Sequence, residues 1–168
     1  NRIAAVDEFG NTAMWGADGT RNERLNWKVG AAARAMDISP GGEALLIGTL
    51  DGAIYLGRAG DKAPKQIAAH GAFINSIRFS PDGDTFLSAS SDHKALLYSL
   101  DGELLREFSH PDKMITSVAF SPNGKEVLTG SEDKTAILWS IDGTRIRDLK
   151  GHAQTVNSVA FSPDGQHL

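Results

Sequence analysis

A four-residue motif, Ser-Pro-x-Gly, recurs along the chain at a constant interval and constrains the fold more than any other feature. The motif begins at residues 39, 80, 121 and 162, so the period is 41 with no drift. A constant period near 40 residues is typical of repeat proteins, in which each unit buries its apolar surface by stacking on its neighbours. The sequence therefore predicts a row of similar units.

Each repeat contains four short segments that are typical of β-strands. In one repeat, apolar Ile74–Phe79 leads into the motif, Thr85–Ser88 follows it, and a turn at Asp92 precedes a segment that ends at Tyr98. A fourth, more polar segment completes the unit, and this spacing indicates an antiparallel sheet. The stretch 31–36 is rich in alanine and has helical propensity. We nevertheless expect a strand there, because it occupies the place of Ile74–Phe79 in its repeat.

The repeats divide the chain, which we take as a single domain, into three complete units and two incomplete ones. We assign the complete units to residues 31–71, 72–110 and 111–151. Residues 1–30, before them, contain the last three strands of a unit, and residues 152–168, after them, contain the first strand of another. The incomplete units are expected to include strands at Arg24–Val29 and Val156–Phe161. If Val156–Phe161 completed the N-terminal unit, the chain would close a ring of four.

Composition narrows the class of protein further. Hydrophobic residues make up 40% of the 168 residues, enough for a packed core. The net charge of −4 and the dispersed Lys and Arg argue against nucleic acid as a partner, and no apolar run is long enough for a membrane helix. Cysteine is absent, which suits a reducing compartment, and we expect a cytoplasmic protein. The chain opens on Asn1 rather than methionine, so we expect it to come from a longer or processed polypeptide.

The amino-acid sequence of the repeats resembles that of one family. The unit with Ser117–Gly124, Leu128–Thr135 and Leu138-Trp139 resembles the tryptophan–aspartate (WD) repeat of β-propellers, and Gly151-His152 continues the pattern. The resemblance implies an all-β fold: a WD-repeat propeller or part of one, with about four four-stranded antiparallel blades. The sequence departs from the family pattern where Trp139 is followed by serine rather than aspartate.

Two sets of polar residues recur with the repeat. His70, Ser88 and Asp92 are followed six residues later by Tyr98, and the same order returns at His110, Thr129, Asp133 and Trp139. A hydroxyl, an imidazole and a carboxylate could serve as the nucleophile, base and orienting group of a hydrolase. The resemblance implies a structural tetrad instead, and recurrence favours it, because a catalytic set needs to occur once. Since tyrosine replaces the indole only in part, we expect the tetrad with Tyr98 to be looser.

Metal and nucleotide sites are not favoured by the sequence. His110-Pro111-Asp112 supplies a candidate pair of ligands, but zinc requires three or four. Asp82-Gly83-Asp84 lacks the spacing of a calcium loop and is better read as a hairpin turn. No glycine-rich stretch carries the lysine of a phosphate loop. We therefore predict no cofactor and no metal.

The remaining candidate is a surface for a protein partner. The resemblance implies that partners bind the face that carries the start of the first strand and the turn after the second. We predict that this face presents Arg34, Leu50, Phe73, Asn75, Ser91, Met114, Thr116, Glu132, Thr155 and Asn157. Phe73 and Met114 lie outside the core alternation and are typical interface anchors, although they could instead fold back over the edge of the blade.

The function favoured by the sequence is a non-catalytic scaffold for protein–protein interaction. It would be a propeller module of a larger protein, or a fragment that pairs with a second copy into an eight-bladed ring. The alternatives are a serine hydrolase and a purely architectural, oligomerising repeat. Neither nucleic acid nor membrane is an expected partner.

Overall fold

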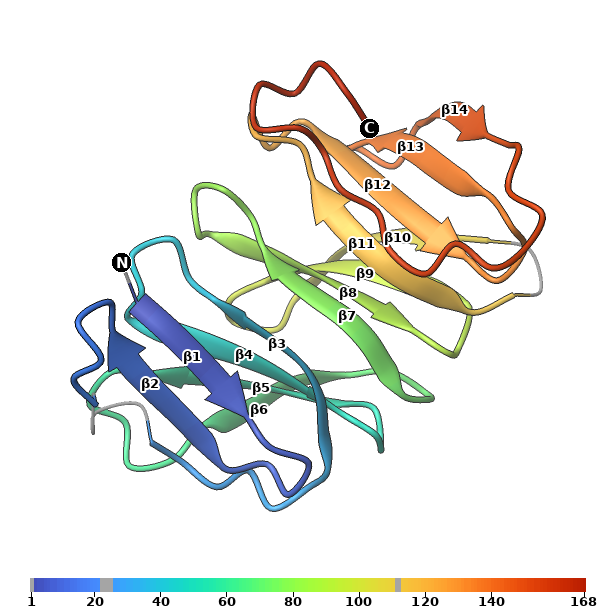
Figure 1. Cartoon of the computed structure of the whole chain (residues 1–168). Helices are drawn as coiled ribbons and strands as arrows, with labels where there is room; N and C mark the ends of the chain where they lie inside the picture. Colours follow the sequence, from blue (N-terminus) through green and yellow to red (C-terminus); the bar gives the residue numbers. More distant parts are fainter. Residues whose placement is uncertain (1, 22–25, 111–112) are drawn as a thin grey trace.

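A computed structural model describes residues 2–21, 26–110 and 113–168, and the fold is all-β, with fourteen strands and no helix in the described residues. Figure 1 shows the strands gathered into separate sheets that follow one another along the chain. The strands are β1 (Arg2–Val6), β2 (Thr12–Gly16), β3 (Ala33–Ile38), β4 (Ala44–Thr49), β5 (Ala53–Arg58), β6 (Lys65–Ala69), β7 (Ile74–Phe79), β8 (Thr85–Ser90), β9 (Lys94–Ser99), β10 (Leu104–Ser109), β11 (Ile115–Phe120), β12 (Glu126–Ser131), β13 (Ala136–Ser140) and β14 (Arg145–Leu149).

Each complete repeat folds into one antiparallel sheet. The sheets β3–β6, β7–β10 and β11–β14 have four strands each. Within each sheet, strands that are consecutive in the sequence pair with one another. β1 and β2 form a separate two-stranded sheet. We call β3, β7 and β11 the inner strands, because they lie beside one another along the row, and β6, β10 and β14 the outer strands. The predicted four-stranded blades are confirmed, and the alanine-rich stretch forms strand β3.

Apolar residues between neighbouring sheets hold the row together. One core cluster joins the sheets β3–β6 and β7–β10, and a second joins β7–β10 and β11–β14. Phe86 stacks on Tyr98 in the first cluster, and Phe108 meets Trp139 edge-on in the second. Full burial of such a side chain contributes about 1.5–3 kcal/mol. The outer strands are mostly exposed, so stability comes from the contact between sheets.

The Ser-Pro-x-Gly motif forms the turn between the inner strand and the next strand. In the turn at Ser80, the Gly83 N–H donates to the Ser80 carbonyl at 2.9 Å, and the Ser80 Oγ accepts from the Thr85 N–H at 3.0 Å. Gly83 has a φ of 81°, which favours glycine. The equivalent glycines 42, 124 and 165 share this conformation. The motif therefore fixes the same tight turn in every repeat.

Side-chain acceptors on the inner strands also tie neighbouring repeats together. The Ser117 Oγ accepts from the Val159 N–H at 3.2 Å, 42 residues along the chain. At the corresponding place β3 has Ala35, which has no hydroxyl. Asp37 supplies the acceptor instead, two residues later, and its Oδ2 accepts from the Phe79 N–H at 2.7 Å. Burial raises the pKa of Asp37, and this N–H opposes the shift.

Two predicted strands are wrong. Of Arg24–Val29, residues 24 and 25 lie outside the described part, and residues 26–29 form no strand. They contact the start of β2 through an isolated bridge between Lys28 and Asn11 and through a hydrogen bond from the Thr12 N–H to the Trp27 carbonyl at 2.8 Å. The buried Trp27 ring packs on Gly57 of β5, and its Nε1–H donates to the Asp61 carbonyl at 3.1 Å.

The second wrong prediction is Val156–Phe161, which has no ladder partner among the residues that the structure describes. Each inner strand pairs with the strand that follows it, and residues 162–168 form a turn region instead. The segment is held against the preceding sheet, where the Val156 N–H donates to the Ser131 carbonyl at 3.0 Å. It lies at the opposite end of the row from β1, so residues 1–168 form an open arc and not a ring of four (Figure 1).

Candidate functional site

The sheet β11–β14 contains a hydrogen-bond network of four side chains. His110 Nδ1 lies 2.8 Å from Asp133 Oδ2, and His110 Nε2 lies 2.8 Å from Thr129 Oγ1. The Trp139 Nε1–H donates to the same Thr129 oxygen at 2.9 Å. These contacts assign the imidazole proton to Nδ1, with Nε2 accepting from the threonine hydroxyl. Burial tends to raise the pKa of Asp133, but hydrogen bonds from Thr135 and His110 outweigh it and lower that pKa.

The sheet β7–β10 contains only three of the four members. His70 Nδ1 lies 2.9 Å from Asp92 Oδ2, and His70 Nε2 lies 2.7 Å from Ser88 Oγ. The placement of Tyr98 in this tetrad is wrong, because its hydroxyl donates to the Ala69 carbonyl at 3.4 Å and makes no bond to Ser88. Burial lowers the pKa of His70, and the Asp92 carboxylate, which raises it, offsets only part of this effect. The neutral imidazole is the form that can accept from Ser88.

The sheet β3–β6 has no such network among its described residues. Ile47 occupies the position of Ser88 and Thr129 and is fully buried. Asp51 keeps the position of Asp92 but accepts from the Thr49 hydroxyl, at 2.5 Å, within its own turn. The three sheets therefore fill one position with a threonine, a serine and an isoleucine.

The accessibility of the hydroxyls decides what the sets can do. Ser88 and Thr129 are both 0% exposed. A nucleophile must reach its substrate and lie near donors for the developing oxyanion, whereas these oxygens are enclosed between strands. The arrangement satisfies buried polar groups and links the strands.

The predicted face residues gather around one hollow. We call it the inner-strand hollow; it has a volume of about 590 Å³. It is lined by Arg34, Phe73, Asn75, Ser91, Met114, Thr116, Glu132, Thr155 and Asn157. Leu50, the tenth predicted residue, is exposed in the β4–β5 turn but does not line the hollow. The repeat thus brings together residues that are more than a hundred positions apart.

Phe73 and Met114 project from backbone that is fixed by hydrogen bonds to the turn after the second strand of each sheet. Phe73 is 50% exposed, and its carbonyl accepts from the Ser91 N–H at 3.0 Å. The Met114 carbonyl accepts from the Glu132 N–H at 3.1 Å and from the Ser131 hydroxyl at 2.9 Å. Met114 itself is half-buried. Since neither residue belongs to a core cluster, the pair gives the hollow apolar surface on a fixed frame.

The polar residues of the hollow are partly engaged with one another. The Asn75 amide donates to the Ser91 hydroxyl at 3.0 Å and to the Ile115 carbonyl at 2.9 Å, which leaves its Oδ1 without a partner in the described residues. The Thr116 hydroxyl donates between the carbonyls of Gly130 and Val156. Thr116 therefore links the backbone segments that surround the hollow, and Asn75 Oδ1 is an acceptor available to a ligand.

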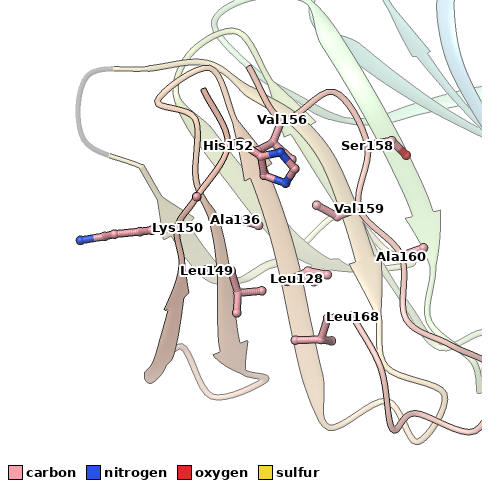
Figure 2. A pocket seen from close by; sticks show the side chains of 11 residues that line it. Leu128, Ala136, Leu149, Lys150, His152, Val156, Ser158, Val159, Ala160 and Leu168 are labelled. Carbon is pink, nitrogen blue, oxygen red and sulfur yellow. The ribbon is translucent and has the colours of Figure 1, made fainter. Parts of the chain in front are cut away.

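A second hollow lies over the sheet β11–β14, at one end of the arc. Figure 2 shows its apolar lining, with Leu128, Val156, Val159 and Leu168 pointing into it. Its volume is about 440 Å³. His152, at its edge, follows the placement of His70 and His110 in the repeat but is exposed and has no partner among the described residues. This surface is the uncovered face of the last sheet.

The candidate metal ligands are used otherwise or lie outside the described residues. Both ring nitrogens of His110 are engaged in the network, and Pro111 and Asp112 lie outside the described part. Asp82 accepts from the Ser80 hydroxyl at 2.5 Å and from the Asp84 N–H at 3.0 Å, as a turn residue does. Among the residues with described positions, no group of three possible ligands lies together.

No helix long and apolar enough to cross a bilayer occurs in the described residues.

Comparison with known families agrees with the sheets and networks. The family described as "WD domain, G-beta repeat" matches residues 62–99, 102–140 and 143–168, which together make up more than half of the chain. The chain therefore belongs to the WD-repeat family. Proteins of this family are generally non-catalytic modules for protein interaction. A search of curated proteins found no match to the chain.

Proposed function

We propose that the chain is a non-catalytic docking module that binds a protein partner at the inner-strand hollow. The observation that carries the proposal is the convergence of residues from neighbouring sheets on one hollow with an exposed aromatic ring. Large apolar side chains on a rigid frame are the usual anchors of interfaces. The family supports the coarser role of interaction scaffold, and the composition favours a cytoplasmic setting.

The experiment pairs two double variants that remove similar apolar surface. Phe73→Ala with Met114→Ala empties the hollow, whereas Leu104→Ala with Ile146→Ala removes side chains that are 52% and 47% exposed on the outer strands. Partners captured by the wild type are identified and their affinities measured with purified proteins. We expect the hollow variant to keep its melting temperature and lose binding by about 30-fold or more, as for interface hot spots. Binding lost only in the control would move the site to the outer strands, which carry Lys65, Arg106, Arg145 and Arg147.

The competing proposal, a serine hydrolase, is opposed by the burial of Ser88. A fluorophosphonate probe tests it directly, since it labels an activated serine. We expect no labelling of the folded chain above that of a Ser88→Ala variant. Labelling that depends on Ser88 and His70 would make the chain an enzyme.

A second proposal concerns the uncovered sheets at the two ends of the arc. Propellers close with four to eight blades, and exposed terminal repeats require a cover. We propose that further blades cover these faces, either in the same polypeptide or in a second copy that completes an eight-bladed ring. Light scattering on residues 1–168 distinguishes the two, because only the second produces a discrete dimer. A stable monomer that exposes no apolar surface to a hydrophobic dye would contradict both.

A further inference from the structure

The charges around the inner-strand hollow suggest more about its partner. Of the residues that line it, Arg34 and Glu132 carry formal charge. Neither side chain has an ion-pair or hydrogen-bond partner among the described residues, although the chain pairs charges elsewhere, as in Lys94–Glu107. Two unpaired charges of opposite sign at one hollow are available to a ligand.

These two charges stand at different sides of the hollow. Arg34 lies on inner strand β3, and Glu132 lies in the turn that follows β12, with the sheet β7–β10 between them. Of the apolar pair, Phe73 comes from the intervening sheet, directly before β7, and Met114 lies directly before β11, where its carbonyl accepts from the Glu132 N–H. A ligand that crosses the hollow therefore meets a cation, then apolar surface, then an anion.

We infer that the hollow binds an extended peptide segment of the partner, with an apolar side chain between an acidic residue that faces Arg34 and a basic residue that faces Glu132. The inference rests on the proposed docking function and specifies its ligand. Packed sheets lie about 10 Å apart, and the two charges are two such spacings apart. Because an extended chain rises about 3.3 Å per residue, the two charged residues of the peptide are roughly six positions apart.

The polar groups of the hollow fit a peptide backbone. Asn75 Oδ1 is an acceptor without a partner in the described part of the chain, and it suits a peptide N–H. The exposed Asn157 side chain makes no hydrogen bond within the described residues and can both donate and accept. An extended backbone presents N–H and C=O groups in alternation, which such side chains can satisfy.

Nucleic acid fits the hollow less well. Binding to a phosphate backbone draws on several cations, each of which neutralises a phosphate. Arg34 is the one cation among the lining residues, and Glu132 repels phosphate. Opposite charges on either side of an apolar patch match a peptide with mixed charge.

Selection from a phage-displayed random dodecapeptide library tests the inference on the whole chain. The baits are the wild type, Arg34→Glu, Glu132→Lys, the hollow variant Phe73→Ala with Met114→Ala, and the outer-strand control Leu104→Ala with Ile146→Ala. We expect the wild type and the control to enrich peptides with an acidic and a basic residue on either side of an apolar one. Arg34→Glu should select a base in place of the acid, and Glu132→Lys an acid in place of the base.

Fluorescence anisotropy with the most enriched synthetic peptide gives the size of the effect. Each charge reversal should weaken binding by about tenfold or more, as for loss of a charge-assisted hydrogen bond, and a peptide with the matching charge reversed should restore it. Arg34 is exposed, so the melting temperature should not change.

The outcomes separate this inference from the docking function. Peptides that depend on Phe73 and Met114 but show the same charges with every bait would overturn the charge inference and leave the docking function standing. Enrichment that is indifferent to Phe73 and Met114 would overturn both. If no peptide is enriched, the peptide inference is wrong, and the capture experiment with folded partners decides the docking function separately.

Discussion

The sheets β11–β14 and β3–β6 occupy equivalent places in the repeat but fill the same buried position in opposite ways. In the first, the Thr129 hydroxyl joins His110 to Trp139. In the second, Ile47 fills the position with hydrocarbon and requires no partner. Both solutions leave no unsatisfied polar group at that point, which is the condition that a buried position imposes.

The sheet β7–β10 lies between these extremes. Ser88 and His70 are bonded, but Tyr98 reaches a backbone carbonyl and not the serine. A blade can thus form with four, three or none of the network residues. The difference teaches that the polar set is one of several ways to fill the interior of a blade, and it agrees with a structural role.

The largest effect is expected from Thr129→Val, which keeps the shape and removes the hydroxyl. His110 Nε2 and Trp139 Nε1 both lose their partner, and each unsatisfied buried group costs about 1–3 kcal/mol. We expect the free energy of unfolding to fall by about 3 kcal/mol in urea denaturation. The matched control is Ile47→Val, for which about 0.5–1.5 kcal/mol is expected. Equal losses at the two positions would mean that the network contributes nothing beyond packing.

A smaller loss is expected when the carboxylate is removed. Asp133→Ala leaves His110 Nδ1 unpaired, so we expect a loss of about 1–3 kcal/mol. Asp51→Ala, at the equivalent position without an imidazole, should cost less, about 0.5–1 kcal/mol, because the hydrogen bonds that are lost lie within an exposed turn and no buried group is left unpaired. Thermal denaturation of both variants makes the comparison. Unchanged stability of Asp133→Ala would remove the structural interpretation of the network.

The pH dependence of stability tests the buried, neutral state of His70. The unfolded chain protonates His70 near pH 6.5, whereas burial lowers the pKa in the folded chain. Between these values the unfolded state binds more protons, so the free energy of unfolding falls as the pH drops below about 6.5 and levels off beneath the folded pKa. His70→Gln should flatten this slope in urea titrations. The same slope in the wild type and the variant would contradict the assignment.

The smallest effect is expected from Tyr98→Phe. This change removes one long hydrogen bond to Ala69, so the loss should be at most about 0.5 kcal/mol, at the low end for a hydrogen bond. Trp139→Phe removes the indole donor to Thr129 and part of the packing, and a loss of about 1–3 kcal/mol, no larger than that of Thr129→Val, is expected. A large loss for Tyr98→Phe would show that Tyr98 belongs to the network after all.

Much of the fold could be predicted because the repeat can be recognised in the amino-acid sequence. Ser80-Pro81 and its equivalents place the turns, and the apolar runs before them place the inner strands. The burial of Trp27 could not be predicted, because it depends on the space beside Gly57 in the next sheet. Val156–Phe161 has the sequence pattern of an inner strand. An inner strand pairs with the strand that follows it, and residues 162–168 form no such strand.

The candidate site was predictable to a similar degree. The repeat aligned Phe73 with Met114 and Asn75 with Thr116, and this was enough to predict all nine of the residues that line the hollow. It could not reveal that the Thr116 hydroxyl is engaged with backbone carbonyls, or that Leu50 lies outside the hollow. Ala35 occupies the position that Ser76 and Ser117 have in their repeats, and this difference is visible in the sequence. It indicated that the hydrogen bond to the next repeat needed another side-chain acceptor, which Asp37 supplies.

Hydrogen–deuterium exchange of the chain, with and without a partner obtained by the capture experiment, tests the central claim most directly. If the inner-strand hollow is the docking site, protection should appear at residues 72–75, 113–116 and 131–133, and exchange in the outer strands β6, β10 and β14 should be unchanged. Protection of the outer strands, with no change around Phe73 and Met114, would contradict the account.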